Sequence, residues 1–206
     1  MKIQISFDLT DLDKALSIAT KVAPYADSLE IGSILIYKYG LHAIEQFRKE
    51  FPDKVLLADA KIVDNGKNAV TILAEAGTNW VTVMAGTRKN IIHSVSTTAH
   101  DLGKQVMLDL LDSCSLGQSA LEAKSMGVDA LLLHRPHDEE DALKFMDTWD
   151  MVKGNSSLPI YVSGKITADN IDKMRLLKPD GIVISKAITE AENPEDEAKK
   201  FKQALS

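Results

Sequence analysis

The chain has 206 residues, enough for one sizeable hydrophobic core, and its 45% hydrophobic and 26% charged residues are ordinary for a globular protein. A net charge of -6 without any basic block argues against a nucleic-acid partner, and no apolar run approaches the ~18 residues that a membrane span needs. Cys114 is the only cysteine and no signal-peptide pattern opens the chain, so we expect a cytoplasmic protein with a single domain over residues 1–206.

Short apolar runs alternate with amphipathic segments eight times along the chain. The apolar runs, which we interpret as strands, cover residues 3–8, 28–32, 55–59, 80–84, 105–109, 130–134, 160–163 and 181–184. The amphipathic segments, which we interpret as helices, begin near Asp11, Tyr39, Asn65, Arg88, Ser115, Asp138, Thr167 and Asn193. Capping residues are expected at Asp11, Thr167 and Asn193, and helix-ending glycines at Gly77, Gly103 and Gly127.

This alternation predicts the α/β class, because successive strand–helix–strand units place their strands in parallel. Eight units with a mean period of roughly 26 residues predict a single (β/α)8 TIM barrel. A doubly wound open sheet is the alternative. The first strand is not followed by a GxGxxG turn, and the number of units also counts against an open sheet.

Residues 55–64 (VLLADAKIVD) carry the strongest functional signal in the chain. An apolar run of this kind is typical of a strand buried on both faces in a parallel sheet. It ends in Asp59, Lys61 and Asp64, and on extended backbone Asp59 and Lys61 would point to the same face. Charges at the end of a buried strand are costly to desolvate unless they pair or take part in chemistry. The alternative is a strand that runs out into a solvated loop.

Polar residues follow most of the other predicted strands as well. In a barrel of this kind, catalytic residues lie at the C-terminal ends of the strands. In chain order these ends carry Asp8, Glu30, Asp59 with Lys61, Asp109, His134, Gly164 with Lys165, and Ser185 with Lys186. Each could be a loop residue if taken alone, but together they would converge on one concave rim. The set therefore favours an active site.

Two carboxylates from neighbouring strands, Glu30 and Asp59, suit Mg²⁺, which binds one or two carboxylates together with water and substrate oxygens. Without a cation, crowded acids at the early strand ends would have raised pKa values. The spacings CxxC and HExxH are absent, which argues against zinc. Lys61 lies between two acids in the sequence, so we expect it to stay protonated and to act as an electrostatic clamp or a proton donor.

The last two strands end in short polar turns, Ser163-Gly164-Lys165 and Ser185-Lys186-Ala187. Barrels often bind a substrate phosphate at this place through backbone N–H groups and a helix N-terminus. Lys165 and Lys186 would add positive charge there. The alternative is that both are ordinary loop lysines.

Residues 59–64 (DAKIVD) match the DxKxxD motif of the orotidine 5′-monophosphate decarboxylase superfamily. Within it, residues 29–32 (LEIG), residues 57–62 (LADAKI) with Asp64 and Gly66, and His134-Arg135 resemble the branch that contains 3-hexulose-6-phosphate synthase and 3-keto-L-gulonate-6-phosphate decarboxylase. The similarity extends over essentially the whole chain. It implies a Mg²⁺-dependent carbon–carbon lyase that acts on a phosphorylated sugar through a 1,2-enediolate.

The resemblance also implies roles for single residues. Glu30 and Asp59 would hold the metal, which stabilises the developing oxyanion as a Lewis acid, and Lys61 would contact the enediolate. Asp64 would reach across the interface of a homodimer into the neighbouring site. The remaining implied roles are substrate positioning by Asp8, proton transfer by His134 near Asp109, and orientation of His134 or of the substrate by Arg135.

Two activities of this branch share the enediolate. The synthase, an aldehyde-lyase, removes a proton from ribulose 5-phosphate and adds the product to formaldehyde, whereas the decarboxylase, a carboxy-lyase, releases CO₂ and then protonates the enediolate. Asp109 favours the synthase, because the decarboxylases tend to carry Glu at that position. An epimerase or isomerase on the same barrel would instead predict His and Asp pairs at the early strands, which here end in Asp8, Glu30 and Asp59 with Lys61.

The chain departs from the branch at the two phosphate turns. Ser163-Gly164-Lys165 stands where Ala-Gly-Gly is usual, and Ser185-Lys186 where Gly-Gly or Gly-Arg is common. Lys186 can replace an arginine with loss of bidentate geometry, but Lys165 puts a side chain where a phosphate needs close approach. These changes keep open a non-catalytic or altered-substrate sugar-phosphate-binding relative.

Overall fold

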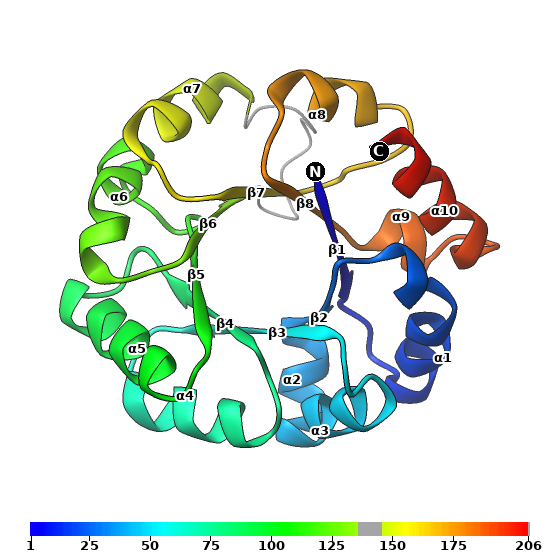
Figure 1. The fold of residues 1–206 in the computed structure, drawn as a ribbon, viewed down its shortest axis with the longest axis horizontal. Coiled ribbons are helices and arrows are strands. Elements are labelled where there is room, and N and C mark those ends of the chain that lie inside the picture. Colours follow the sequence, from blue (N-terminus) through cyan, green and yellow to red (C-terminus); the bar gives the residue numbers. More distant parts are fainter. Residues whose placement is uncertain (136–145, 206) are drawn as a thin grey trace.

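In the computed structural model, which describes residues 1–135 and 146–205, eight parallel strands close into one barrel in chain order (Figure 1). The strands are β1 (Lys2–Phe7), β2 (Ser28–Ile31), β3 (Val55–Ile62), β4 (Trp80–Met84), β5 (Gln105–Asp109), β6 (Ala130–His134), β7 (Ile160–Ser163) and β8 (Gly181–Ile184). β1 pairs with both β2 and β8, which closes the ring. The predicted (β/α)8 barrel is confirmed, and β3 runs three residues further than predicted.

The helices form an outer ring around the strands (Figure 1). They are α1 (Leu12–Val22), α2 (Ser33–Tyr39), α3 (Leu41–Glu50), α4 (Gly66–Glu75), α5 (Lys89–Asp101), α6 (Leu116–Ala123), α7 (Met146–Asn155), α8 (Ile171–Leu177), α9 (Lys186–Thr189) and α10 (Pro194–Ala204), with short 3₁₀ turns η1 (Ala23–Tyr25) and η2 (Lys124–Met126). Two helices, α2 and α3, stand where one was expected near Tyr39, because Gly40 separates them with a φ of 59°. The predicted helix start near Asp138 lies outside the described residues.

Local capping signals explain where several helices begin and end. Asp11 accepts a hydrogen bond from the Lys14 amide at 2.9 Å and Asn193 accepts one from the Asp196 amide, as expected. The expectation of a cap at Thr167 is wrong, since α8 begins after Asn170. The Asn170 side chain instead spans the preceding turn, where it accepts from the Thr167 amide and donates to the Lys165 carbonyl, both at 2.9 Å.

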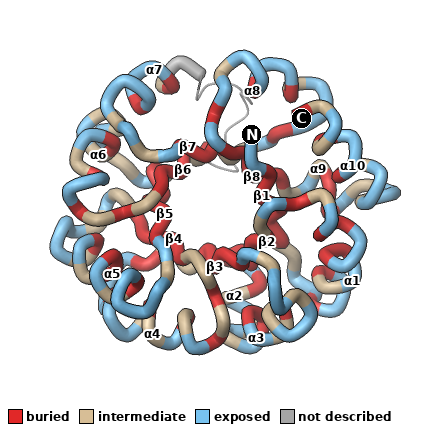
Figure 2. Tube along the Cα trace, viewed as in Figure 1, coloured by how far each residue is buried: buried red, intermediate tan, exposed pale blue. Residues whose placement is uncertain are grey.

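Apolar residues fill two spaces. The larger core lies between the strands and the helices, and Figure 2 shows the buried positions following the strand ring and the inward faces of the helices. A smaller cluster fills the barrel interior towards the strand starts: Leu57, Met107, Ala130, Leu132, Tyr161 and Val183, with Trp80 packed against it. The interior is therefore closed by side chains at one end. Among the helices of the described chain, none has both the length and the apolar character that crossing a membrane requires.

Candidate active site

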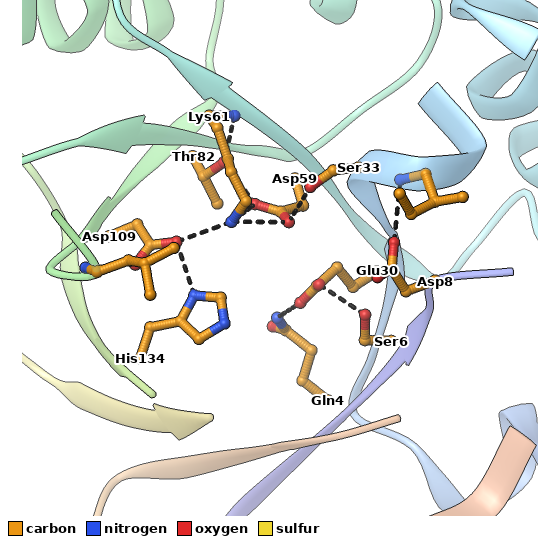
Figure 3. A network of polar contacts seen from close by, with 12 residues as sticks. Gln4, Ser6, Asp8, Glu30, Ser33, Asp59, Lys61, Thr82, Asp109 and His134 are labelled. Carbon is orange, nitrogen blue, oxygen red and sulfur yellow. Dashed lines mark hydrogen bonds and ion pairs between the residues drawn. The ribbon is translucent and has the colours of Figure 1, made fainter. Parts of the chain in front are cut away.

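A layer of polar side chains, here called the polar layer, lies directly above the smaller apolar cluster in the barrel interior. Strand side chains alternate, so the residue two positions after an inward-facing apolar residue also faces inward. Leu57 is followed in this way by Asp59, Met107 by Asp109, and Leu132 by His134. The polar side chains of β2 to β6 thus meet on neighbouring strands at the C-terminal end, as the strand-end pattern predicts (Figure 3).

The backbone around Lys61 is not a regular strand. Lys61 has a φ of 46°, in the left-handed region, and the β3–β4 pairing shifts register between Ala58 and Ile62. The expectation that Asp59 and Lys61 share a face is confirmed, because the Lys61 ammonium lies 3.1 Å from the Asp59 carboxylate. A bulge with a left-handed residue produces this arrangement, however, and not the plain alternation of an extended strand.

Lys61 bridges two carboxylates in the middle of the polar layer. Its Nζ lies 3.1 Å from Asp59 and 3.0 Å from Oδ2 of Asp109 (Figure 3). Burial disfavours the ammonium, but the charges and hydrogen bonds of Asp109 and Asp59 outweigh it and raise the pKa of Lys61 well above its ordinary value. Lys61 is therefore a fixed positive charge, as expected, and is unsuited to Schiff-base chemistry.

His134 is attached to the same network through Asp109. Its Nδ1 lies 2.9 Å from Asp109 Oδ2, and Asp109 is fully buried. Burial opposes the ionisation of Asp109, but His134 and Lys61 outweigh it and lower the pKa of this carboxyl. Burial likewise disfavours the imidazolium, yet the hydrogen bond and charge of Asp109 raise the pKa of His134. Since an ionised carboxylate only accepts hydrogen bonds, Nδ1 carries a proton and Nε2 is the atom that can exchange one.

Glu30 is buried beside Asp59 and is held by two side chains of β1. Ser6 Oγ donates to Oε1 at 2.7 Å and the Gln4 amide donates to Oε2 at 2.5 Å (Figure 3). Burial, followed by the negative charge of Asp59, raises the pKa of Glu30 to about 7 against the effect of these hydrogen bonds. The expected crowding of acids at the early strands is thus present, and a cation between Glu30 and Asp59 would relieve it.

The donor set suits a hard divalent cation. The described residues contain no group of three or more His, Cys, Asp or Glu side chains that could hold a metal, so a site made entirely of protein ligands is not formed. Mg²⁺ does not need one, because it binds through one or two carboxylates and takes its other ligands from water and substrate oxygens. The carboxylates of Glu30 and Asp59 fit that requirement.

Asp8 has a structural role that the sequence did not suggest. Its Oδ1 accepts a hydrogen bond from the Ile34 amide at 2.9 Å and so caps α2 from the position just after β1. Gly32, at the start of α2, makes this possible, since a Cβ there would lie 2.7 Å from that same oxygen. Asp8 is therefore fixed near the rim, and its expected contact with substrate stays a prediction.

Asp64 lies apart from the network. It follows β3 in the exposed segment that begins at Val63, whose exposed fraction is 57%.

Arg135, by contrast, is buried just after β6, and its amide donates to the Ser163 carbonyl at 3.0 Å. Gly164 packs against it, because a Cβ on Gly164 would lie 2.5 Å from the Arg135 Cβ. The ends of β6 and β7 are thus in close contact.

The two candidate phosphate turns are neighbours, because β7 pairs with β8. In the first turn Gly164 has a φ of 131° and Lys165 a φ of 43°, so Lys165 keeps a left-handed backbone that glycine adopts more easily. In the second, Ser185 is half-buried before α9 and Lys186 is exposed. The backbone of the first turn is therefore compatible with a glycine-type loop, while Lys165 adds an exposed side chain.

Sequence reasoning missed the residues that hold the charged groups in place: Gln4, Ser6, Ser33 and Thr82. Ser33 donates to Asp59 Oδ2 at 2.7 Å and Thr82 donates to Oδ1 at 2.9 Å. Gln4 and Ser6 alternate with apolar residues in β1, and this spacing was a usable sign that they face the barrel interior.

Comparison with known proteins identifies the family of the chain. The family model described as orotidine 5′-phosphate decarboxylase / HUMPS family matches residues 1–201. A 3-hexulose-6-phosphate synthase of Bacillus subtilis (strain 168) is 27% identical over 207 residues, covering 100% of this chain and 99% of that protein. The crystal structure of a 3-hexulose-6-phosphate synthase from Salmonella typhimurium has 32% identity and a TM-score of 0.93, with 100% and 98% of the two chains covered.

The fold also occurs in a 3-keto-L-gulonate-6-phosphate decarboxylase from Vibrio cholerae, at 24% identity and a TM-score of 0.85, covering 99% of this chain and 96% of that one. The match along the sequence and the shared barrel point to the same family. The chain belongs to the orotidine 5′-phosphate decarboxylase / HUMPS family.

Proposed function

We propose that the protein is an aldehyde-lyase of the 3-hexulose-6-phosphate synthase type, which condenses ribulose 5-phosphate with formaldehyde through a 1,2-enediolate and depends on Mg²⁺. The observation that carries the proposal is the protonated Lys61 held between Asp59 and Asp109, with His134 bonded to Asp109. Relatives at 27% and 32% identity over the whole chain have this name. The single free cysteine, Cys114, is compatible with a reducing cytoplasm.

The proton transfers fall to His134. Its Nε2, when neutral, removes a proton from C1 of ribulose 5-phosphate, and the Asp109 carboxylate stabilises the imidazolium that results. Lys61 faces the negative charge that develops on the enediolate oxygens. The enediolate carbon then bonds to the carbon of formaldehyde, and the imidazolium returns the proton to the formaldehyde oxygen, so that no net proton is consumed.

Glu30 and Asp59 are the residues that would hold the Mg²⁺. When bound, the cation supplies Lewis-acid stabilisation of negative charge on substrate oxygens. We assign substrate positioning to Asp8 and Arg135. The phosphate would bind at the adjacent turns after β7 and β8, where Gly164, Lys165, Ser185 and Lys186 offer backbone N–H groups, a hydroxyl and positive charge.

We also propose a homodimer in which Asp64 completes the partner's site. Its exposure outside the network, next to the exposed apolar Val63, supports this. The test mixes two inactive variants, Lys61→Ala and Asp64→Ala. A mixed dimer would contain one site with both residues, so random exchange should restore about a quarter of the wild-type turnover. A purely local role for Asp64 would leave the mixture inactive.

A pair of assays tests the reaction. Purified protein with Mg²⁺ receives ribulose 5-phosphate and formaldehyde in one assay, followed by formaldehyde loss, and 3-keto-L-gulonate 6-phosphate in the other, followed by CO₂ release. Formaldehyde loss that requires Mg²⁺ and disappears in Lys61→Ala and Asp59→Asn, both still folded, supports the synthase. Lys49→Ala, which removes an exposed lysine of α3, is the control and should keep wild-type rates. Near-native rates in Lys61→Ala would refute the assignment.

The decarboxylase is the second candidate, and the raised pKa of His134 favours it. After CO₂ has left, the enediolate needs a proton donor, and an imidazolium supplies one. CO₂ release without formaldehyde consumption would select this activity. Sugar-phosphate binding without turnover, unchanged in Lys61→Ala, would instead indicate a non-catalytic relative. The epimerase alternative is weakened, because the histidine that joins this network comes from β6 and not from an early strand.

A further inference from the structure

Strand β4 has a single residue opposite the segment of β3 that runs from Asp59 to Lys61. The β3–β4 register pairs Ala58 with Val81 and then Ile62 with Val83. Three residues of β3, Asp59 to Lys61, therefore lie opposite one residue of β4, which is Thr82. A regular ladder cannot provide partners for all the backbone groups of such a bulge, so some must be satisfied by other means.

The Thr82 hydroxyl is the hydrogen-bond partner of one of these backbone groups. It accepts a hydrogen bond from the Lys61 amide at 2.9 Å and lies 2.9 Å from Asp59 Oδ1 (Figure 3). A hydroxyl has one proton to donate and lone pairs that accept. The amide can only donate and the ionised carboxylate can only accept, so the direction of both bonds is fixed. Thr82 is 1% exposed, and water does not compete for these bonds.

These bonds close a ring through the reactive groups. Thr82 fixes the Asp59 carboxylate and the Lys61 backbone relative to each other, and the Lys61 ammonium returns to the same carboxylate at 3.1 Å. Lys61 needs such support, because its φ of 46° is unfavourable for a residue with a side chain. We infer that Thr82 is a positioning residue whose hydroxyl sets the geometry of Asp59 and Lys61 for the reaction. This inference rests on the proposed function.

The test compares Thr82→Val, which replaces the hydroxyl with a methyl group of similar size, with Thr82→Ser, which keeps it. Thr78→Val is the matched control, since Thr78 is a buried threonine just before β4 whose hydroxyl donates to the Trp80 carbonyl at 2.6 Å, with the Leu56 carbonyl at 3.2 Å, away from the polar layer. Two measurements are made. Hydrogen–deuterium exchange of the Lys61 amide is followed by NMR, which needs no substrate, and kcat and KM are determined in whichever assay the wild type is active.

In Thr82→Val the Lys61 amide loses its acceptor, so we expect its exchange to accelerate about 10- to 100-fold. We expect kcat to fall by a similar factor with little change in KM, because the reactive groups are misplaced and not removed. Thr82→Ser should restore both values to within a few-fold of wild type. Thr78→Val should lower thermal stability without changing Lys61 exchange or kcat.

Wild-type exchange of the Lys61 amide in Thr82→Val would overturn the inference. Faster exchange with an unchanged kcat would also overturn it, since Thr82 would then support only the backbone. Failure of Thr82→Ser to restore kcat would argue against the hydroxyl as the active element. A wild type silent in both assays would refute the proposed function, while the exchange comparison would still decide whether Thr82 holds Lys61.

Discussion

Asp109→Asn is the sharpest test of the charge network, because it keeps the shape of a fully buried side chain and removes its charge. Asp109 Oδ2 accepts hydrogen bonds from the Lys61 ammonium at 3.0 Å and from His134 Nδ1 at 2.9 Å, while Oδ1 accepts one from the Leu111 amide at 2.9 Å. An asparagine has one oxygen for these two positions. In either orientation of the amide, its NH₂ group faces a donor.

The expected cost follows from these contacts. Removing one partner of a buried ion pair destabilises a protein by about 3–5 kcal/mol, and because Lys61 keeps Asp59 we expect about 3 kcal/mol. The shift in the pKa of His134 should also reverse, from above its ordinary value of about 6.5 in the wild type to below it in Asp109→Asn. The burial that disfavours the imidazolium remains, whereas the charge of Asp109 that outweighs it is gone. With His134 no longer oriented or charged, turnover should fall by about 10² to 10⁴.

The pH dependence has a definite sign. In the wild type, the raised pKa of His134 contributes stability that is complete below about pH 6.5 and is lost as the pH rises through the folded-state value. Asp109, whose pKa is lowered, contributes stability above the unfolded carboxyl value of about 3.9. The stability difference between wild type and Asp109→Asn should therefore be largest between about pH 4 and 6.5 and narrow at higher pH.

Urea unfolding across this pH range and an NMR titration of the His134 ring measure both effects. Asp129→Asn, which neutralises the acid of the partly exposed His100–Asp129 pair, is the control and should leave turnover within about twofold of wild type. An unchanged titration of His134 in Asp109→Asn, or a stability difference that grows with pH, would refute the reasoning.

Three further predictions concern Glu30, Lys165 and Arg48. Without divalent cations, the raised pKa of Glu30 should lower the free energy of unfolding of the wild type by on the order of 3 kcal/mol relative to Glu30→Gln as the pH rises from about 4.5 to 7. Mg²⁺ should reduce this loss, and equal pH profiles of the two proteins in urea unfolding would contradict the prediction. Lys165→Gly should stabilise by about 1 kcal/mol, because glycine adopts the left-handed φ of 43° without strain; a lower Tm would argue against that strain. Arg48→Met should destabilise by about 2–3 kcal/mol, since Arg48 binds the carbonyls of Phe51, Pro52, Lys54 and Gly77, yet kcat of the folded enzyme should stay unchanged.

The barrel could be predicted from the sequence because its strands are short, continuous apolar runs bounded by turns. β4 to β8 begin and end where the pattern places them. β3 was predicted too short, because the charges of Asp59 and Lys61 marked an apparent end, whereas the strand continues through a bulge and pairs again at Ile62. Hydrophobic periodicity assumes regular backbone and cannot indicate a residue such as Lys61 in the left-handed region.

The charged members of the network could likewise be predicted, because ionisable residues at the ends of parallel strands must meet at one rim. The residues that hold these charged side chains in place could not be predicted. Thr82 and Ser33 are ordinary residues in the sequence, and their function depends on which carboxylate oxygen they reach. The capping of α2 by Asp8 depends on a contact between neighbouring strands that no local motif encodes.

The protonation state of His134 connects the structure to the choice between the two reactions. The synthase begins with a neutral Nε2 that removes a proton, so kcat/KM should rise with pH through the pKa of His134. The decarboxylase ends with an imidazolium that donates a proton after CO₂ has left, so its kcat should fall over the same range. Because Asp109 raises this pKa, the transition should lie above about 6.5 in either case, and His134→Gln should remove it. The direction of the profile, measured with each substrate, therefore reports which proton transfer this network performs, and a profile that stays flat in the wild type would exclude His134 from both.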